Sequence, residues 1–346
     1  MVYQYWVMGE FVFVILFLSV VIFQLWRKSK HKVKTSLPET IAGKVWYFTK
    51  YIFRILGVGF GTLLALFLFI MIERDILTVY TETMPTPSQV EIPTDLGFQV
   101  KEVTFQSEDG ITLAGWLAPS QNGATIILLH GFGGNRTGMI WHARQLVDAG
   151  YGALMYDERA SGESGGTYRS YGWEDTRDVK AAIQFLKSRS AGTKIGALGC
   201  SMGADIVVYS AALYPEIGAA WGDGNSSVRA KDIGAPKNPL MAAIIAGNYT
   251  LDWMYTVKLG IKAPAPLVDV IGQIAPRPLM LVGGGSPINI LGSEGEVYTY
   301  RFAKLAGPSA QAWVIPEATH CNGPSVRPDE YSRRMVQFFD SAFEGK

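Results

Sequence analysis

The residues with the clearest chemical potential form the sequence GCSMG at 199–203. An apolar run at 195–198 precedes it, and small or apolar residues at 204–212 follow. Glycine on both sides of the central residue lets a strand turn sharply into a helix, because neither position carries a Cβ that would collide with the other element. At such a turn, Ser201 lies beside the amide of Met202 at the positive end of the helix. The pattern favours a serine nucleophile for acyl transfer.

Composition narrows the function classes. The chain has 346 residues and a formal net charge of +1, so it lacks the basic footprint of a nucleic-acid-binding protein. Its two cysteines, Cys200 and Cys321, adjoin candidate catalytic residues and do not indicate a structural disulfide. No CxxC or His-rich pattern is present, and the sequence implies neither a metal nor an organic cofactor.

Two apolar segments, residues 7–26 and 55–72, are each long enough to cross a hydrocarbon core of about 30 Å. No Lys or Arg precedes the first and no small-residue cleavage site follows it, which favours a transmembrane helix over a signal peptide. The segment 27–54 between them carries eight cations and one acid. The positive-inside bias therefore predicts a cell-membrane protein with a cytoplasmic loop at 27–54 and a catalytic domain on the extracytoplasmic side.

The remaining chain alternates strands with helices. Residues 1–75 are the expected two-helix anchor, 76–98 an extended Pro-containing linker, and 99–346 the catalytic domain. A hairpin is expected at 100–117, and continuous apolar runs predict strands buried on both faces. These runs lie at 124–129, 151–156, 195–198, 217–221, 276–282 and 311–315. Helical periodicity separates them, which predicts a parallel sheet covered on both faces, and an apolar insertion at 224–273 is a candidate cap.

Five motifs follow one another along the chain: HGFGG, DERASGESGG, GCSMG, IAPRPLMLVGG and PEATHCNG. Together they resemble the α/β-hydrolase family over about residues 97–346. The resemblance implies an α/β fold: a mostly parallel, eight-stranded sheet with helices on both faces and a small helical cap, here preceded by an all-α transmembrane hairpin. It also implies a nucleophile–acid–histidine triad.

By this resemblance Ser201 is the nucleophile and His320, in the loop after the last strand, is the general base. The other histidines fit less well: His31 lies in the basic loop and His142 on a helix face. His130 matches the structural histidine that braces the family's oxyanion loop.

The resemblance also assigns the oxyanion hole. The backbone amides of Phe132 and Met202 match the two donors that stabilise the tetrahedral intermediate.

The acid departs from the family pattern. An aspartate is usual shortly after the seventh strand, and this chain has Ser286 there. Glu296 is the first candidate because its longer side chain can make up distance, Glu294 is the second, and Asp223, after the sixth strand, is the third.

Two alternative sites receive less support. Asp157, Glu158 and Glu163 lie in a Gly-rich turn and are expected to be solvated or paired with Arg159 rather than to bind a metal. Cys200 precedes Ser201, the residue whose side chain the turn exposes, and is expected to behave as a small hydrophobic residue.

The sequence therefore predicts a membrane-anchored serine hydrolase acting on a small-molecule ester, thioester or amide, with the lipid bilayer as its partner and no nucleic acid. An esterase or acyl hydrolase is favoured over a serine peptidase because no peptide-gripping domain is present. A perhydrolase variant stays open. So does a membrane-tethered binding or scaffold domain, which the missing aspartate favours.

Overall fold

A computed structural model describes residues 38–343 except 191, 290 and 291. The described chain divides into two compact units, with the boundary after Asp75. Helix α2 (Ile41–Thr83) forms most of the described part of the first unit. Its most apolar 18-residue window has a mean hydropathy of 2.6, and none of that window is buried. The predicted span 55–72 lies within α2, whereas the predicted span 7–26 lies outside the described residues.

Helix α2 is longer than the apolar pattern predicts. It includes residues 41–54, expected as part of the loop, and residues 76–83, expected as part of the extended linker. Lys44, Lys50 and Arg54 are polar, but lysine and arginine are good helix formers, so they do not interrupt the helix. The helix ends at Thr83, just before Pro85, because a proline disfavours helical backbone in the residue before it.

The second unit is built on a sheet of eight strands within the described residues. The strands are β2 (Lys101–Gln106), β3 (Thr112–Ala118), β4 (Ala124–Leu129), β5 (Gly152–Tyr156), β7 (Lys194–Cys200), β8 (Ile217–Asp223), β9 (Leu279–Gly284) and β12 (Ala310–Ile315). Their order is β12-β9-β8-β7-β4-β5-β3-β2. β3 is antiparallel to both of its neighbours and all other pairs are parallel.

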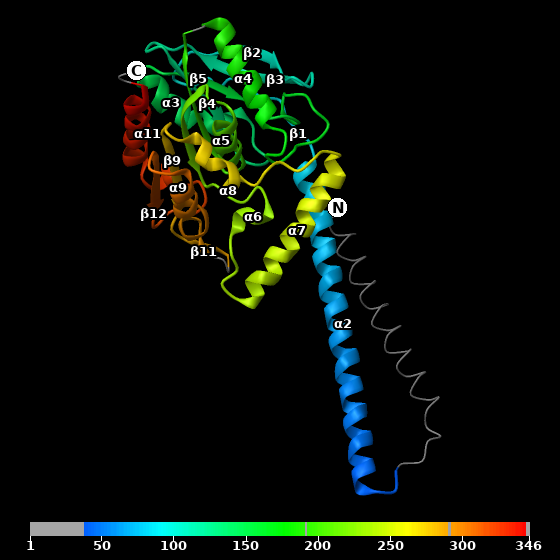
Figure 1. Cartoon of the computed structure of the whole chain (residues 1–346). Helices are drawn as coiled ribbons and strands as arrows, with labels where there is room; N and C mark the ends of the chain where they lie inside the picture. Colours follow the sequence, from blue (N-terminus) through cyan, green and yellow to red (C-terminus); the bar gives the residue numbers. More distant parts are fainter. Residues whose placement is uncertain (1–37, 191, 290–291, 344–346) are drawn as a thin grey trace. The chain divides into compact units, whose positions relative to one another are not determined.

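Helices cover both faces of this sheet. The long ones are α3 (Ile140–Asp148), α4 (Thr176–Arg189), α5 (Met202–Leu213), α9 (Tyr300–Ala306) and α11 (Pro328–Phe343). α3 and α11 lie side by side on one face (Figure 1). In β4, Ile127 and Leu129 join the core beneath α4 and α5, while Ile126 and Leu128 join the core beneath α3 and α11. Alternate residues of a strand point to opposite faces, so a strand buried on both sides is apolar at most of its positions.

Shorter elements complete the unit. The insertion expected at 224–273 holds α6 (Ala230–Ile233), α7 (Pro239–Leu259), α8 (Leu267–Val270) and the 3₁₀ helix η2 (Ile271–Ile274). The others are β1 (Thr86–Pro87), which pairs with β6 (Ser161–Gly162), β10 (Pro287–Asn289), which pairs with β11 (Gly292–Ser293), η1 (Arg136–Met139), the π-helix η3 (Gly295–Thr299) and α10 (Gly323–Val326). α7 is the long element of the insertion. Its N-cap is Asn238, whose side chain accepts a hydrogen bond from Met241 N at 2.8 Å, and its C-cap is Gly260, which has φ 67°.

Candidate active site

Ser201 occupies a sharp turn between β7 and α5. Its φ of 57° lies in the left-handed region, which a non-glycine residue adopts only when its surroundings hold it there. A Cβ on Gly199 would collide with the carbonyl of Gly203, and a Cβ on Gly203 would collide with the carbonyl of Leu129. The two glycines are therefore required by close approach of the strand and helix, as the sequence pattern predicts.

His320 reaches Ser201 from the loop between β12 and α10. The distance from its Nε2 to Ser201 Oγ is 2.7 Å, and its side chain is 48% exposed. Its Nδ1 faces a carboxylate, which can only accept, so the neutral ring carries its proton on Nδ1. Nε2 is then free to accept the proton of the serine hydroxyl.

The carboxylate at His320 belongs to Glu294. Glu294 Oε1 accepts from His320 Nδ1, and Oε2 accepts from the backbone N–H of Gly284 at 2.9 Å. The Glu294 side chain is only 2% exposed. The hydrogen bond to this carboxylate raises the pKa of His320 above its usual value, against the opposing effect of burial. The structure thus places the second sequence candidate, rather than Glu296, against the imidazole.

The backbone around Ser286, where the resemblance expects an acid, is hydrogen-bonded to the chain that follows β12. The N–H of Gly285 donates to Ile315 O at 2.8 Å, and that of Ser286 donates to Ala318 O at 3.1 Å. A Cβ on Gly284 would lie 2.7 Å from Ala318 O. The segment after β9 therefore supports the histidine loop through its backbone. The carboxylate that contacts His320 follows the short β10–β11 hairpin. It belongs to a glutamate, whose longer side chain makes up the distance, but this glutamate lies two residues before Glu296, the first sequence candidate.

Asp223, the third candidate, has different partners. Its Oδ2 accepts from the hydroxyl of Tyr331 at 2.7 Å, and its carbonyl accepts from Ser201 N at 2.8 Å. Burial raises the pKa of Asp223 to about 6. It supports the turn at Ser201 and does not hydrogen-bond His320.

The loop after β4 brings Phe132 to the same place. A Cβ on Gly131 would lie 3.3 Å from Ser201 Cβ, so this backbone passes directly beside the serine. His130 Nε2 accepts from Glu158 N at 3.1 Å, and its Nδ1 donates to Gly131 O at 2.9 Å. Burial lowers the pKa of His130, which keeps the ring neutral for these two bonds. The His130 ring therefore holds the loop through hydrogen bonds at both of its nitrogens. Met202, the first residue of α5, directly follows Ser201.

Comparisons with known sequences match parts of this chain to a family model and to several relatives. The family model described as serine aminopeptidase, S33, matches residues 120–251. The chain is 28% identical over 255 residues to the uncharacterized protein YfhR of Escherichia coli K12, covering 71% of this chain and 82% of YfhR. It is also 34% identical over 119 residues to a thiohydrolase of Eupenicillium brefeldianum, which covers 33% of this chain and 39% of that protein.

Among solved structures, the Pyrococcus furiosus esterase Pf2001 matches with a TM-score of 0.59 and 27% sequence identity. The match covers 75% of this chain and 98% of the esterase. The second unit has the α/β-hydrolase fold. The fold expected from the five ordered motifs is thereby confirmed for the α/β-hydrolase unit.

The loop after β4 has a second support that the sequence did not predict. The guanidinium of Arg169 lies over the ring of Phe132, 4.1 Å from its centroid, and Nη2 donates to Thr81 O at 2.9 Å. Tyr171 packs edge-on against the same ring at 5.7 Å. These contacts join residues separated by 37 to 88 positions in the sequence, so no local sequence pattern predicts them.

The acids of the loop after β5 pair with a different arginine from the one expected. Asp157 accepts from the backbone N–H of Arg136 and from its Nη1, both at 2.7 Å, and Glu163 pairs with the same guanidinium. Arg159 instead pairs with Asp178 at 2.7 Å. Burial raises the pKa of Glu158 well above its usual value, so this carboxyl is neutral. The described residues contain no group of three or more His, Cys, Asp or Glu arranged to hold a metal ion.

Two other features lie outside the hydrogen-bonded set. Cys321 donates to Asp223 O at 3.2 Å, and its hydrogen bond with Cys200, aided by burial, raises the pKa of the Cys321 thiol, so that thiol stays protonated.

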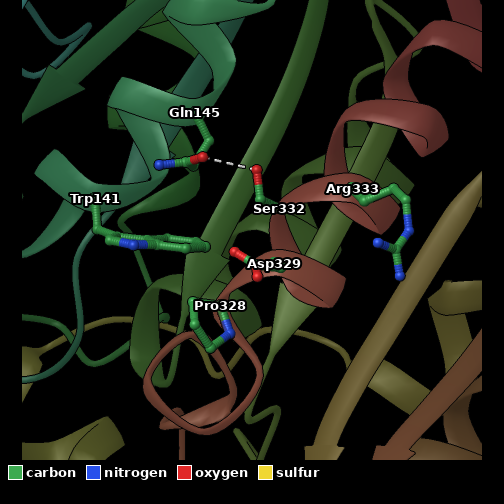
Figure 2. Close-up of a pocket in the computed structure, with 6 residues that line it drawn as sticks. All are labelled: Trp141, Gln145, Pro328, Asp329, Ser332 and Arg333. Carbon is green, nitrogen blue, oxygen red and sulfur yellow. Dashed lines mark hydrogen bonds between the residues drawn. The ribbon is translucent and has the colours of Figure 1, made fainter.

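A separate hollow of about 400 Å³ lies between α3 and α11, where Gln145 and Ser332 are hydrogen-bonded at 2.7 Å (Figure 2). None of the residues around Ser201 lines it.

Proposed function

We propose that this chain is a serine hydrolase that cleaves carboxylic esters or thioesters through an acyl-enzyme on Ser201. The observation that carries the proposal is the continuous hydrogen-bonded series from Ser201 Oγ through His320 to the buried carboxylate of Glu294. A hydroxyl is a weak nucleophile until a base accepts its proton, and this arrangement supplies both the base and the group that orients it.

In the acylation half, Ser201 Oγ attacks the carbonyl carbon of the substrate while His320 Nε2 takes the hydroxyl proton. The carbonyl oxygen becomes an oxyanion, and in this proposal the amides of Phe132 and Met202 donate to it. Glu294 stabilises the imidazolium that forms, and His320 then gives the proton to the leaving alkoxide or thiolate. The carbon–heteroatom bond breaks and the acyl group stays on Ser201.

In the deacylation half, a water molecule takes the place of the leaving group. His320 Nε2 accepts one of its protons as the water oxygen attacks the acyl carbon, and the second tetrahedral intermediate collapses to the free acid. The proton returns to Ser201 Oγ. No step requires a group outside Ser201, His320, Glu294 and the two backbone amides.

The test is hydrolysis of p-nitrophenyl esters together with labelling by a fluorophosphonate probe. Ser201→Ala should abolish both, and His320→Ala should lower both by at least about 10³-fold. Cys200→Ala is the neighbouring control and should keep most of the activity. Full activity in Ser201→Ala, or no labelling of the wild type, would contradict the proposal and favour a binding or scaffold domain. The missing aspartate is the feature that favours that alternative, and in this proposal Glu294 takes its place.

The match to the aminopeptidase family model favours a second candidate, a serine peptidase that uses the same residues. Cleavage of an amide requires protonation of the leaving nitrogen, and His320 could also supply that proton. Parallel assays with p-nitrophenyl esters and amino-acid p-nitroanilides separate the two. We expect the ester reaction to dominate, because the esterase match covers 98% of the esterase whereas the aminopeptidase model matches only residues 120–251 of this chain.

We further propose that the hydrolase is membrane-anchored. Helix α2 supports this, since its apolar window is long enough to cross a bilayer and none of that window is buried. Retention of the full chain in membranes after alkaline carbonate washing is the expected result, and release into the supernatant would contradict it.

A further inference from the structure

The outward side of α7 is apolar along its length. Five exposed residues follow one stripe of the helix: Ala242, Ala246, Tyr249, Trp253 and Val257. Their spacing of three or four residues places them on a single face. Tyr249, Trp253 and Val257 are 55%, 62% and 63% exposed, far more than apolar side chains that serve only the core. The opposite face of α7, with Ile245, Tyr255 and Leu259, is buried against the hydrolase.

The exposed charged residues within and directly flanking α7 in the sequence are all lysines. The exposed charged residues between 237 and 262 are Lys237, Lys258 and Lys262, located at the two ends of α7. The acid in this range, Asp252, is buried and pairs with Arg229 at 3.0 Å. Apolar and aromatic residues bordered by lysines are typical of a helix that lies in the interface of a bilayer.

The chain itself holds α7 near the bilayer that α2 is proposed to cross. Val79 packs in one apolar cluster with Tyr255 and Leu259 of α7. Six residues lie between Val79 and Ile72, the last residue of the apolar run, and the seven Cα–Cα steps that join the two can span at most about 25 Å in any conformation. The C-terminal end of α7 is therefore within that reach of the membrane surface.

The same end of α7 also adjoins the candidate active site. The ring of Tyr255 stacks on Tyr171 with centroids 6.4 Å apart, and Tyr171 packs on Phe132 of the oxyanion loop. A bilayer contact along α7 would thus bring the loop beside Ser201 close to acyl chains dissolved in the membrane.

We propose that α7 docks on the lipid bilayer, with its apolar stripe at the level of the acyl chains and its lysines among anionic headgroups. The inference rests on the proposed anchor and hydrolase activity, and it names the substrate class: acyl esters presented by a membrane. A protein partner could cover the same stripe, but the tether to α2 and the uniformly basic margins favour lipid.

The first experiment uses the full chain in nanodiscs of phosphatidylcholine and phosphatidylglycerol that contain a lipid with a photoactivatable acyl chain. Labelled peptides are identified by mass spectrometry. We expect labels in α2 and on the 249–257 face of α7. Labels in α2 alone would overturn docking while leaving the anchor intact, and this is also the result that a protein-binding stripe would give. Labels in neither helix would overturn both the anchor and the docking.

The second experiment compares a soluble ester, p-nitrophenyl acetate, with a long-chain ester dissolved in the same nanodiscs. A triple variant, Tyr249→Ser with Trp253→Ser and Val257→Ser, should lose about tenfold or more on the membrane ester, because burial of these side chains no longer favours docking. Its rate on p-nitrophenyl acetate should stay within about twofold, since the stripe is exposed and outside the catalytic set.

The matched control is Tyr300→Ser with Leu305→Ser on α9, whose side chains are 57% and 44% exposed. This variant should keep both rates. An equal loss on both esters in the α7 variant, or no loss on either, would overturn the proposal. A wild type that is inactive on p-nitrophenyl acetate would contradict the hydrolase proposal, and lipid labelling of α7 would still decide whether the helix docks.

Discussion

At the scale of single residues, Glu294 has two neighbours that both donate to it: His320 Nδ1 and the N–H of Gly284. Glutamine has the same shape but offers one acceptor and one donor group. In Glu294→Gln, an amide oxygen facing Gly284 leaves the NH₂ group facing Nδ1. The imidazole must then carry its proton on Nε2, where it cannot act as a base toward Ser201.

We therefore expect Glu294→Gln to lower kcat by roughly 10³ to 10⁴-fold, the magnitude of a wrong tautomer in a serine triad. The measurement is the steady-state rate on a p-nitrophenyl ester. Glu296→Gln is the matched control two residues away and should stay within about twofold of the wild type. A larger loss in Glu296→Gln than in Glu294→Gln would show that Glu294 is not the acid.

The pH profile tests the same pair. Only neutral His320 can accept a proton, so kcat/KM should rise with pH through the pKa of His320 in the free enzyme. Because Glu294 favours the protonated imidazole, that pKa is raised above its usual value of about 6.5, and the midpoint of the rise should lie on the alkaline side of it.

In Glu294→Gln the favourable charge is gone and the opposing effect of burial remains, so the His320 pKa should fall. Chemical shifts of the imidazole Hε1 proton as a function of pH report this even when the rate is too low to measure. An unchanged His320 pKa in the variant would mean that Glu294 does not govern the base.

At the scale of elements, the elbow depends on how closely β7, α5 and β4 approach. A methyl group on Gly203 would collide with backbone carbonyls of Leu129 and His130, which cannot move without shifting β4 and the oxyanion loop. Gly203→Ala should lower the free energy of unfolding by about 1–3 kcal/mol and reduce kcat with it. Urea unfolding and ester hydrolysis measure the two effects.

Gly272→Ala serves as the comparison. A Cβ at this exposed position of η2 would meet only Leu305 O, at an ordinary 3.5 Å. We expect a change within about 0.5 kcal/mol and unaltered activity. Equal stability of the Gly203 and Gly272 variants would remove close packing as the reason for the glycines.

The elements differ in how far the sequence determines them. The run at 124–129 predicts β4 to the residue, since a strand buried on both faces is apolar at most of its positions. The elbow is predictable because two glycines and a serine carry its whole geometry. The acid is not, because its position depends on the β10–β11 hairpin, a short pairing with no apolar pattern of its own. The support from Arg169 is equally hidden, since it depends on contacts distant along the chain.

At the scale of the whole molecule, the proposed membrane anchor predicts on which side the second unit lies, and this prediction depends on α2 and the charges before it. Lys44, Lys50 and Arg54 are inside α2 on the N-terminal side of its apolar run, and more cations precede them at 27–34. Cations next to a span stay in the cytoplasm. The hydrolase follows the other end of the span and is therefore expected outside, whether or not residues 7–26 form a second helix.

The charge distribution around α2 predicts the result of fusing reporters to Lys346 in Escherichia coli. Alkaline phosphatase, which folds only outside the cytoplasm, should be active, and a green fluorescent protein fusion should be dark. Deleting residues 1–26 should leave both results unchanged, because the cations before α2 remain. Replacing the cations at 27–54 with glutamine should produce mixed orientation and partial fluorescence. A fluorescent, phosphatase-negative fusion of the unaltered chain would place the hydrolase in the cytoplasm and refute the charge argument, while leaving the chemistry at Ser201 to be judged separately.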